Sequence, residues 1–134
     1  MQPLHLLMIA AGGAVGASGR YVLYHLLHVH ASVASYWAIG IINIIGCLGI
    51  GLLFGWLDAR GVEGERLRIF LSWGILGAFT TFSTFAADAL ELIREGRIGQ
   101  SLLYVLGSVV IGMALVWLGY AIAGGSWAAN NATA

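Results

Sequence analysis

Residues 74–85 decide the fold that we predict for this chain, and they read Gly74-Ile-Leu-Gly-Ala-Phe-Thr-Thr-Phe-Ser-Thr-Phe85. Four hydroxyl side chains fall within five consecutive positions of this apolar stretch: Thr80, Thr81, Ser83 and Thr84. Such side chains bond locally to the backbone and compete with helical hydrogen bonds, and Gly77 weakens a helix further. We therefore predict a helix that is broken near its centre, within residues 77–84.

The rest of the chain is too apolar for a water-soluble domain of this length. Of the 134 residues, 60% are hydrophobic and 9% are charged. A transmembrane helix needs about 20 mainly apolar residues, and residues 4–27, 36–57, 69–92 and 102–123 all meet this requirement. The predicted fold class is an all-α membrane protein with four transmembrane helices. They form a single domain, 1–127, which is followed by a disordered tail, 128–134.

The charges of the loops do not favour one orientation in the membrane. With four spans, the second loop lies on the side of both termini and carries Arg60, Arg66 and Arg68, and the third loop carries Arg94 and Arg97. Orientation follows the excess of Lys and Arg in short loops, and the bias here is three against two. We predict that the chain inserts in both orientations and that opposite copies pair as an antiparallel, dual-topology homodimer.

Glycines at a spacing of four residues would let helices approach closely in such a dimer. Gly12 and Gly16 have this spacing in the first span, and Gly51 and Gly55 have it in the second. Glycine is also simply common in membrane helices. The sequence leaves both interpretations open.

A break in the middle of the membrane has a functional implication. Irregular backbone is tolerated at this depth only where it is buried in protein or lines an aqueous path, and freed carbonyls and helix ends bind ions. Phe82 and Phe85 are three residues apart, so they share a face where the chain is helical. The electropositive edges of their rings can attract an anion. The other interpretation is that both rings only pack or face lipid.

Polar side chains in the other parts of the spans are further candidates. Asn43 either bonds between helices or donates its amide N–H to a passing anion. Tyr104 and Ser108 share a face of the fourth helix and extend a hydroxyl track, unless Tyr104 is an interfacial anchor. Arg20 lies deep in the first span, where a charge indicates a functional site by default, and Asp88 lies close to the predicted break.

The remaining residues do not indicate an enzyme or a metal centre built from side chains. His5, His25, His28 and His30 lie near helix ends without an accompanying carboxylate or cysteine arrangement. Cys47 is alone, which excludes an internal disulfide. We find no nucleophile–base pair or phosphate-binding glycine loop, and a net charge of zero does not suit a nucleic-acid partner.

Three motifs resemble those of the CrcB/Fluc family of fluoride channels. Thr80-Thr81-Phe82-Ser83-Thr84-Phe85, preceded by Gly74-x-x-Gly77, resembles the third-helix signature of the family. Gly12-Gly13-x-x-Gly16-Ala17-x-x-Arg20-Tyr21 is similar to its first-helix motif, and Asn43-x-x-Gly46 is similar to its second-helix motif. The three motifs occur in the order of the family and span most of the chain.

The resemblance implies a function and a set of site residues. It implies a dual-topology homodimer in a bacterial inner membrane, with two antiparallel pores that export fluoride passively. Ring edges of Phe82 and Phe85 and the amide of Asn43 would contact the ion, beside a polar track formed by Thr81, Ser83, Thr84, Tyr104 and Ser108. A structural Na⁺ at the dimer centre would be held by backbone carbonyls of Gly77 and Thr80. Arg20 matches the arginine of the family's first helix.

Some positions depart from the family pattern. Ala78 stands where the family usually has a second glycine, and Ala38-Ile39-Gly40 stands where it usually has Gly-Thr-Leu. Asp88 replaces a common glutamate, and Gly112 replaces a serine found in some relatives. These departures leave the two phenylalanines and Asn43 intact, and they affect the details of the polar track and the vestibule.

Two other functions are compatible with the size and charge of the chain. A small dual-topology drug–proton exchanger needs an ionisable carboxylate deep in a span, but the first two spans have none and Asp88 is near a helix end. A non-transporting assembly subunit would use Asn43 and the hydroxyl groups only to join helices. Proton-coupled substrate uptake would identify the first function, and a stable hetero-complex without ion flux would identify the second.

Overall fold

Helices form nearly all of the structure, a computed structural model that describes residues 2–61 and 64–126. The predicted disordered tail, 128–134, lies outside the described residues. Within the described ranges the chain has no strand, and four helical stretches are long and apolar enough to cross a membrane. These stretches are Pro3–His30, Ser35–Ala59, Glu65–Arg94 and Ile98–Ile122. The predicted all-α fold with four membrane-spanning helices is confirmed.

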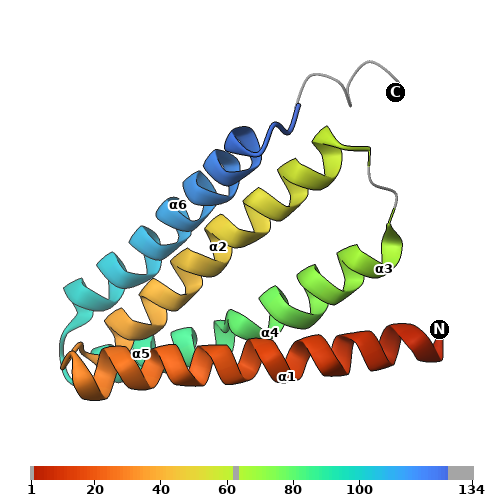
Figure 1. Cartoon of the computed structure of the whole chain (residues 1–134). Helices are drawn as coiled ribbons and strands as arrows, with labels where there is room; N and C mark the ends of the chain where they lie inside the picture. Colours follow the sequence, from red (N-terminus) through yellow and green to blue (C-terminus); the bar gives the residue numbers. More distant parts are fainter. Residues whose placement is uncertain (1, 62–63, 127–134) are drawn as a thin grey trace.

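Three of the four spans are continuous helices (Figure 1). The first consists of α1 (Pro3–His25) and a π-helical end, η1 (Leu26–His30). The second is α2 (Ser35–Ala59), and the fourth is α6 (Ile98–Ile122). Several helices extend beyond the predicted segments, because the polar residues that flank an apolar span still complete helical turns. Apolarity therefore predicts the embedded part of each helix better than its ends.

The third span is divided, as predicted. It begins with α3 (Glu65–Arg68), continues through the π-helical segment η2 (Ile69–Leu76) and the short α4 (Gly77–Phe79), and resumes as α5 (Phe82–Arg94). Only Thr80 and Thr81 lie between α4 and α5. The break thus falls inside the interval 77–84 that the hydroxyl cluster predicted.

The four spans form two pairs that diverge from one end of the molecule. One pair is α2 and α6, and the other is α1 with η2 and α4. Both pairs meet near α5, which contacts α2 and α6, and they separate toward the ends of α2 and α3 (Figure 1). The protomer is therefore V-shaped. Its small buried core lies at the closed end and includes Ile39, Ile42, Phe85, Leu92 and Tyr104.

Glycines set the close approach within each pair. Gly12 and Gly16 face η2, and a Cβ at Gly16 would overlap the carbonyl oxygen of Ile75. Gly51 and Gly55 face α6, where a Cβ at either position would overlap a backbone carbonyl. Backbone atoms cannot rotate away as side chains do, so these positions require the smallest residue. Both glycine pairs therefore serve helix packing within one protomer.

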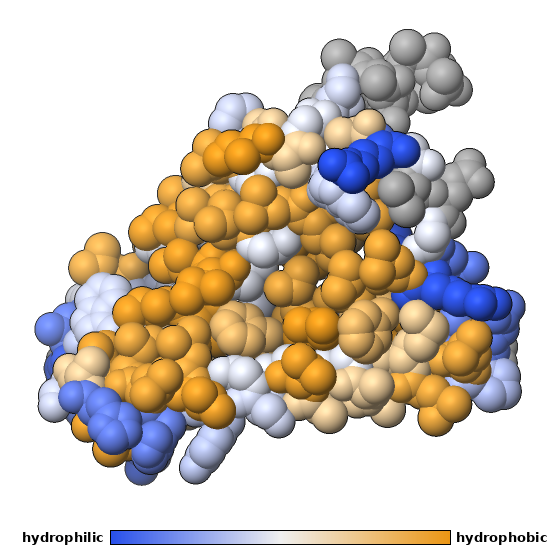
Figure 2. Space-filling model, viewed as in Figure 1, coloured by the Kyte–Doolittle hydropathy of each residue, from blue (hydrophilic) through white to orange (hydrophobic). Residues whose placement is uncertain are grey.

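The face of the protomer that Figure 2 shows is mostly apolar. Many large hydrophobic side chains are exposed, among them Leu7, Trp73, Leu103, Val110 and Met113. Hydrophilic side chains gather at the ends of the helices (Figure 2). An apolar belt between polar ends suits a helical protein whose surroundings are lipid or further protein.

Candidate functional site

The hydroxyl side chains end one helix and start the next. Thr80 (φ −79°, ψ 156°) and Thr81 (φ −146°, ψ 122°) both have extended backbone. The hydroxyl of Thr80 donates to the carbonyl of Leu76 at 3.0 Å. Thr81 is the N-cap of α5, and its hydroxyl accepts a hydrogen bond from the backbone N–H of Thr84 at 3.3 Å. The side chains thus replace some of the helical hydrogen bonds that the break removes.

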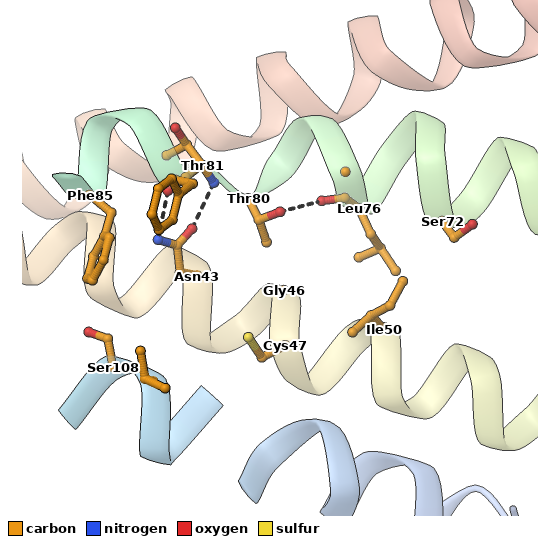
Figure 3. A pocket seen from close by; sticks show the side chains of 13 residues that line it. Asn43, Gly46, Cys47, Ile50, Ser72, Leu76, Thr80, Thr81, Phe85 and Ser108 are labelled. Carbon is orange, nitrogen blue, oxygen red and sulfur yellow. Dashed lines mark hydrogen bonds between the residues drawn. The ribbon is translucent and has the colours of Figure 1, made fainter. Parts of the chain in front are cut away.

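Asn43 on α2 holds the broken segment at two points (Figure 3). The backbone N–H of Thr81 donates to Asn43 Oδ1 at 2.8 Å, and Asn43 Nδ2 donates to the carbonyl of Thr81 at 3.0 Å. One amide therefore satisfies both backbone groups of an extended residue inside the membrane, where unpaired groups are costly. A carboxamide NH2 group carries two hydrogens, so Asn43 retains a donor besides the one that Thr81 accepts.

A cavity of about 360 Å³ lies beside the break, between the two helix pairs. Seven of the predicted site residues line it: Asn43, Gly77, Thr80, Thr81, Phe82, Phe85 and Ser108. They come from α2, α4, the break, α5 and α6, and Figure 3 shows Asn43, Thr81, Phe85 and Ser108 around the same space. The structure thus brings the amide, two phenylalanine rings and the hydroxyls of α6 and the break into one site.

The two phenylalanine rings are in contact but differ in exposure. Their centroids are 5.9 Å apart, with an interplanar angle of 40°. Phe85 is 8% exposed and packs on Tyr104, with centroids 4.8 Å apart, whereas Phe82 is 79% exposed. The predicted shared face is confirmed. Phe85 is fixed by the core, and Phe82 is presented at the surface of the protomer.

The remaining hydroxyl groups of the predicted polar track do not line this cavity. The Thr81 hydroxyl donates to Thr84 Oγ1 at 3.1 Å and lies 3.4 Å from Ser83 Oγ. Tyr104 is 2% exposed and lies behind Phe85, between that ring and Tyr36. Although Tyr104 and Ser108 are one helical turn apart, the first is in the core and the second is in the cavity.

Arg20 lies at a separate, smaller cavity of about 290 Å³. This second cavity lies between α1, α2 and α5 and is lined by Tyr24, Ile39 and Thr84 in addition to Arg20. Thr84 is hydrogen-bonded to Thr81, which lines the first cavity. A hydrogen bond thus joins a residue that lines the first cavity to one that lines the second.

Asp88 is tied to the first two spans by residues that the sequence did not single out. Ser35 Oγ donates to Asp88 Oδ1 at 3.2 Å, and the Tyr24 hydroxyl donates to Ser35 Oγ at 3.1 Å.

Cys47 and Ser72 also line the first cavity. Neither residue belongs to a motif or has a spacing that would indicate this position, because their approach to the break depends on how the helix pairs cross.

These features define a multi-pass integral membrane protein in which an interrupted helix and its neighbours line a cavity with polar side chains and aromatic rings. The chain belongs to the family described as "CrcB-like protein, Camphor Resistance (CrcB)", which matches residues 7–120. The family resemblance of the motifs is therefore confirmed.

Curated relatives of the chain are named "Fluoride-specific ion channel FluC". A relative from Methylobacillus flagellatus is 37% identical over 86% of this chain and 91% of its own length. A relative from Methylobacterium sp. (strain 4-46) is 42% identical over 89% of this chain and 95% of its own length. A third, from Thermus thermophilus, is 37% identical over 88% of this chain and 94% of its own length.

Proposed function

We propose that the protein is a channel through which fluoride crosses the membrane passively, down its electrochemical gradient. The observation that carries the proposal is the broken third span, which Asn43 docks so that an amide, hydroxyl groups and two aromatic rings line one cavity. The printed names of the relatives support the same function. No feature of the described residues favours the drug–proton exchanger over this function.

The chemistry of the cavity suits a small, strongly hydrated anion. A pore must replace the water of such an ion with hydrogen-bond donors and still allow the ion to leave. The second amide hydrogen of Asn43 and the hydroxyl of Ser108 supply donors, and the rings of Phe82 and Phe85 supply electropositive edges. We propose that Thr81, Ser83, Thr84 and Tyr104 extend this polar environment. Chloride is larger and is excluded by size.

The exposed position of Phe82 supports the proposed antiparallel homodimer. A bare protomer leaves this ring 79% exposed and leaves the side of the V open (Figure 1). A second copy related by a two-fold axis in the membrane plane would cover both, because such an interface is self-complementary. Each protomer contributes one cavity beside its break, so the dimer has two antiparallel pores.

The backbone at the break supports the proposed Na⁺ site. In an unbroken helix the carbonyl of Gly77 accepts from the N–H of Thr81, and the carbonyl of Thr80 accepts from the N–H of Thr84. Here Thr81 N–H donates to Asn43 and Thr84 N–H donates to the Thr81 hydroxyl. Both carbonyls have lost their helical donors, and free carbonyl oxygens at broken helices suit Na⁺. Two copies of the break at the dimer centre would double this ligand set.

We propose electrostatic roles for Arg20 and Asp88 and a location in the inner membrane of a bacterium. The Arg20 guanidinium at the second cavity raises the local positive potential for an approaching anion. Asp88, held by Ser35, lies further along α5 from the break than Phe85 and contributes the opposing charge. The relatives named above are bacterial, which supports the proposed location.

The direct test is fluoride efflux from liposomes that contain the purified protein, followed with a fluoride electrode. We expect a fluoride leak that exceeds that of protein-free liposomes and a much slower chloride leak under the same gradient. Absence of the fluoride leak, or chloride efflux at an equal rate, contradicts the proposal. Efflux that requires a proton gradient would instead indicate an exchanger.

A further inference from the structure

The first span ends in a polar cap that the proposed function does not use. The span contains 28 residues, which corresponds to roughly 40 Å of helix, whereas the hydrocarbon core is roughly 30 Å thick. Its last turns carry His25, His28 and His30, and all three are exposed. Hydrophilic side chains gather at this end of α1 (Figure 2). These histidines are therefore accessible at the membrane surface.

The π-helical end brings two of the histidines together. In an α-helix, residues five apart differ by roughly 140° in direction and do not meet. In η1 the N–H of Ala31 instead bonds to the carbonyl of Leu26, five residues earlier, at 3.0 Å. This hydrogen-bond pattern stacks residue i+5 over residue i. The rings of His25 and His30 are accordingly 5.4 Å apart, with an interplanar angle of 80°.

We propose that His25 and His30 form a binding site for a divalent transition-metal ion of the kind that imidazole prefers, such as Zn²⁺ or Cu²⁺. Zinc binds histidine nitrogen at about 2.0–2.1 Å in tetrahedral geometry. Two imidazoles on one such ion have ring centres roughly 5 Å apart. The observed 5.4 Å is compatible with this separation, so the two rings can reach one ion through side-chain rotation without movement of the backbone.

The neighbouring side chains do not add a third ligand to this site. Nδ1 of His28 lies 2.8 Å from the carbonyl of Val33, and its ring stacks on Tyr24, so His28 is held by other contacts. Tyr21 stacks on His25, with centroids 6.2 Å apart, and restricts that ring. The described part of the chain contains no group of three His, Cys, Asp or Glu side chains placed to hold a metal. A tetrahedral ion held by two histidines takes water at its two other positions, which is fewer protein ligands than the three of typical open zinc sites.

Calorimetric titration with Zn²⁺ tests the site on the untagged, full-length protein in detergent. We expect one Zn²⁺ per chain for the wild type, and binding at least about tenfold weaker for both His25→Ala and His30→Ala, because each removes one of two ligands. His5→Ala and His28→Ala are matched controls and should bind as the wild type does. Equal binding by all four variants, loss only in His28→Ala, or no binding by the wild type overturns the proposal.

Electron paramagnetic resonance with Cu²⁺ gives a second readout that does not depend on affinity. The signal of the wild type should show two coordinated nitrogens, and that of His30→Ala should show one. A single nitrogen in the wild-type signal also overturns the site. Neither measurement uses fluoride flux, so the result is independent of the channel function.

Discussion

Two regions of the protein satisfy their backbone hydrogen bonds in different ways. One is the pair of helices α2 and α6, and the other is the broken third span. Both lie in an apolar environment, where each backbone N–H and C=O needs a partner. The helices α2 and α6 are unbroken for 25 residues each and satisfy their backbone internally. The third span interrupts its own hydrogen bonds at Thr80 and Thr81 and borrows partners from Asn43 and from hydroxyl side chains.

The difference indicates which part of the fold provides stability and which part provides the site. At Gly51 and Gly55, α2 packs so closely on α6 that glycine meets backbone directly, and no space for a ligand remains between the helices there. The break costs helical hydrogen bonds and exposes an amide, carbonyls and aromatic rings to a cavity. A membrane protein keeps such a break only when neighbouring groups satisfy it. We therefore expect substitutions at the break to affect flux, stability or both, and substitutions at the packing glycines to affect stability.

The largest effect should come from the two rings at the break. Phe82→Ile and Phe85→Ile remove the electropositive ring edges, so we expect fluoride efflux to fall to the level of protein-free liposomes in both variants. Both variants should elute from size-exclusion chromatography at the position of the wild type. Leu90→Ile, at an exposed position of the same helix, is the control and should retain flux. Unchanged efflux in both phenylalanine variants would show that the rings do not contribute to fluoride permeation.

Asn43→Leu should destabilise the protein more than a substitution at a single packing glycine or at the cap of α5. It leaves the N–H and C=O of Thr81 without their partner, at a cost of about 1–3 kcal/mol for each group. We expect the free energy of unfolding in detergent to fall by about 2–6 kcal/mol. Ile45→Leu, at a partly exposed position of the same helix, is the control. A loss below that of the control would show that the break does not depend on the amide.

Gly51→Ala should weaken the unbroken pair while leaving the cavity intact. The added Cβ would overlap the carbonyl of Val116, and overpacking of this kind costs typically about 1–3 kcal/mol. Gly107→Ala is the matched control, because a Cβ there meets nothing within 4 Å. That variant should be neutral or slightly more stable, since alanine favours a helix by about 1 kcal/mol. Thermal unfolding of both variants measures the difference, and equal stability would contradict the close approach.

The smallest effect should come from the cap of α5. Thr81→Val keeps the shape of the side chain but removes the oxygen that accepts from Thr84 N–H, and loss of an N-cap costs about 1 kcal/mol. Ser83→Ala is the control, because Ser83 Oγ makes only the longer 3.4 Å contact. We expect Thr81→Val to unfold at a lower denaturant concentration than Ser83→Ala. The reverse order would show that Thr81 does not cap the helix.

Local patterns in the sequence predicted several features correctly. Continuous apolar stretches predicted four spans, and the hydroxyl cluster with Gly77 predicted the break. The three-residue spacing of Phe82 and Phe85 predicted that they would share a helix face, and their rings are in contact. Each of these features depends on neighbours along one helix, whose geometry is the same in every protein.

Other features depend on how helices from distant parts of the chain cross. The polarity of Asn43 did not indicate that it pairs with Thr81, and the one-turn spacing of Tyr104 and Ser108 did not indicate that one is buried and the other lines a cavity. The sequence did not indicate that the rings of His25 and His30 meet, because the π-helical turn between them has no signature in the residues themselves.

By itself, the sequence determined that this chain crosses a membrane four times, that its third helix cannot remain continuous, and which family it resembles. Only the tertiary structure decided that the helices pair as α2 with α6 and α1 with the third span, and that Asn43 completes the broken backbone. The physical reason is the distance along the chain between the residues that interact. Hydrophobic length and helix breaking act between residues close in sequence, whereas packing and the pairing of buried polar groups require two helices to be placed side by side.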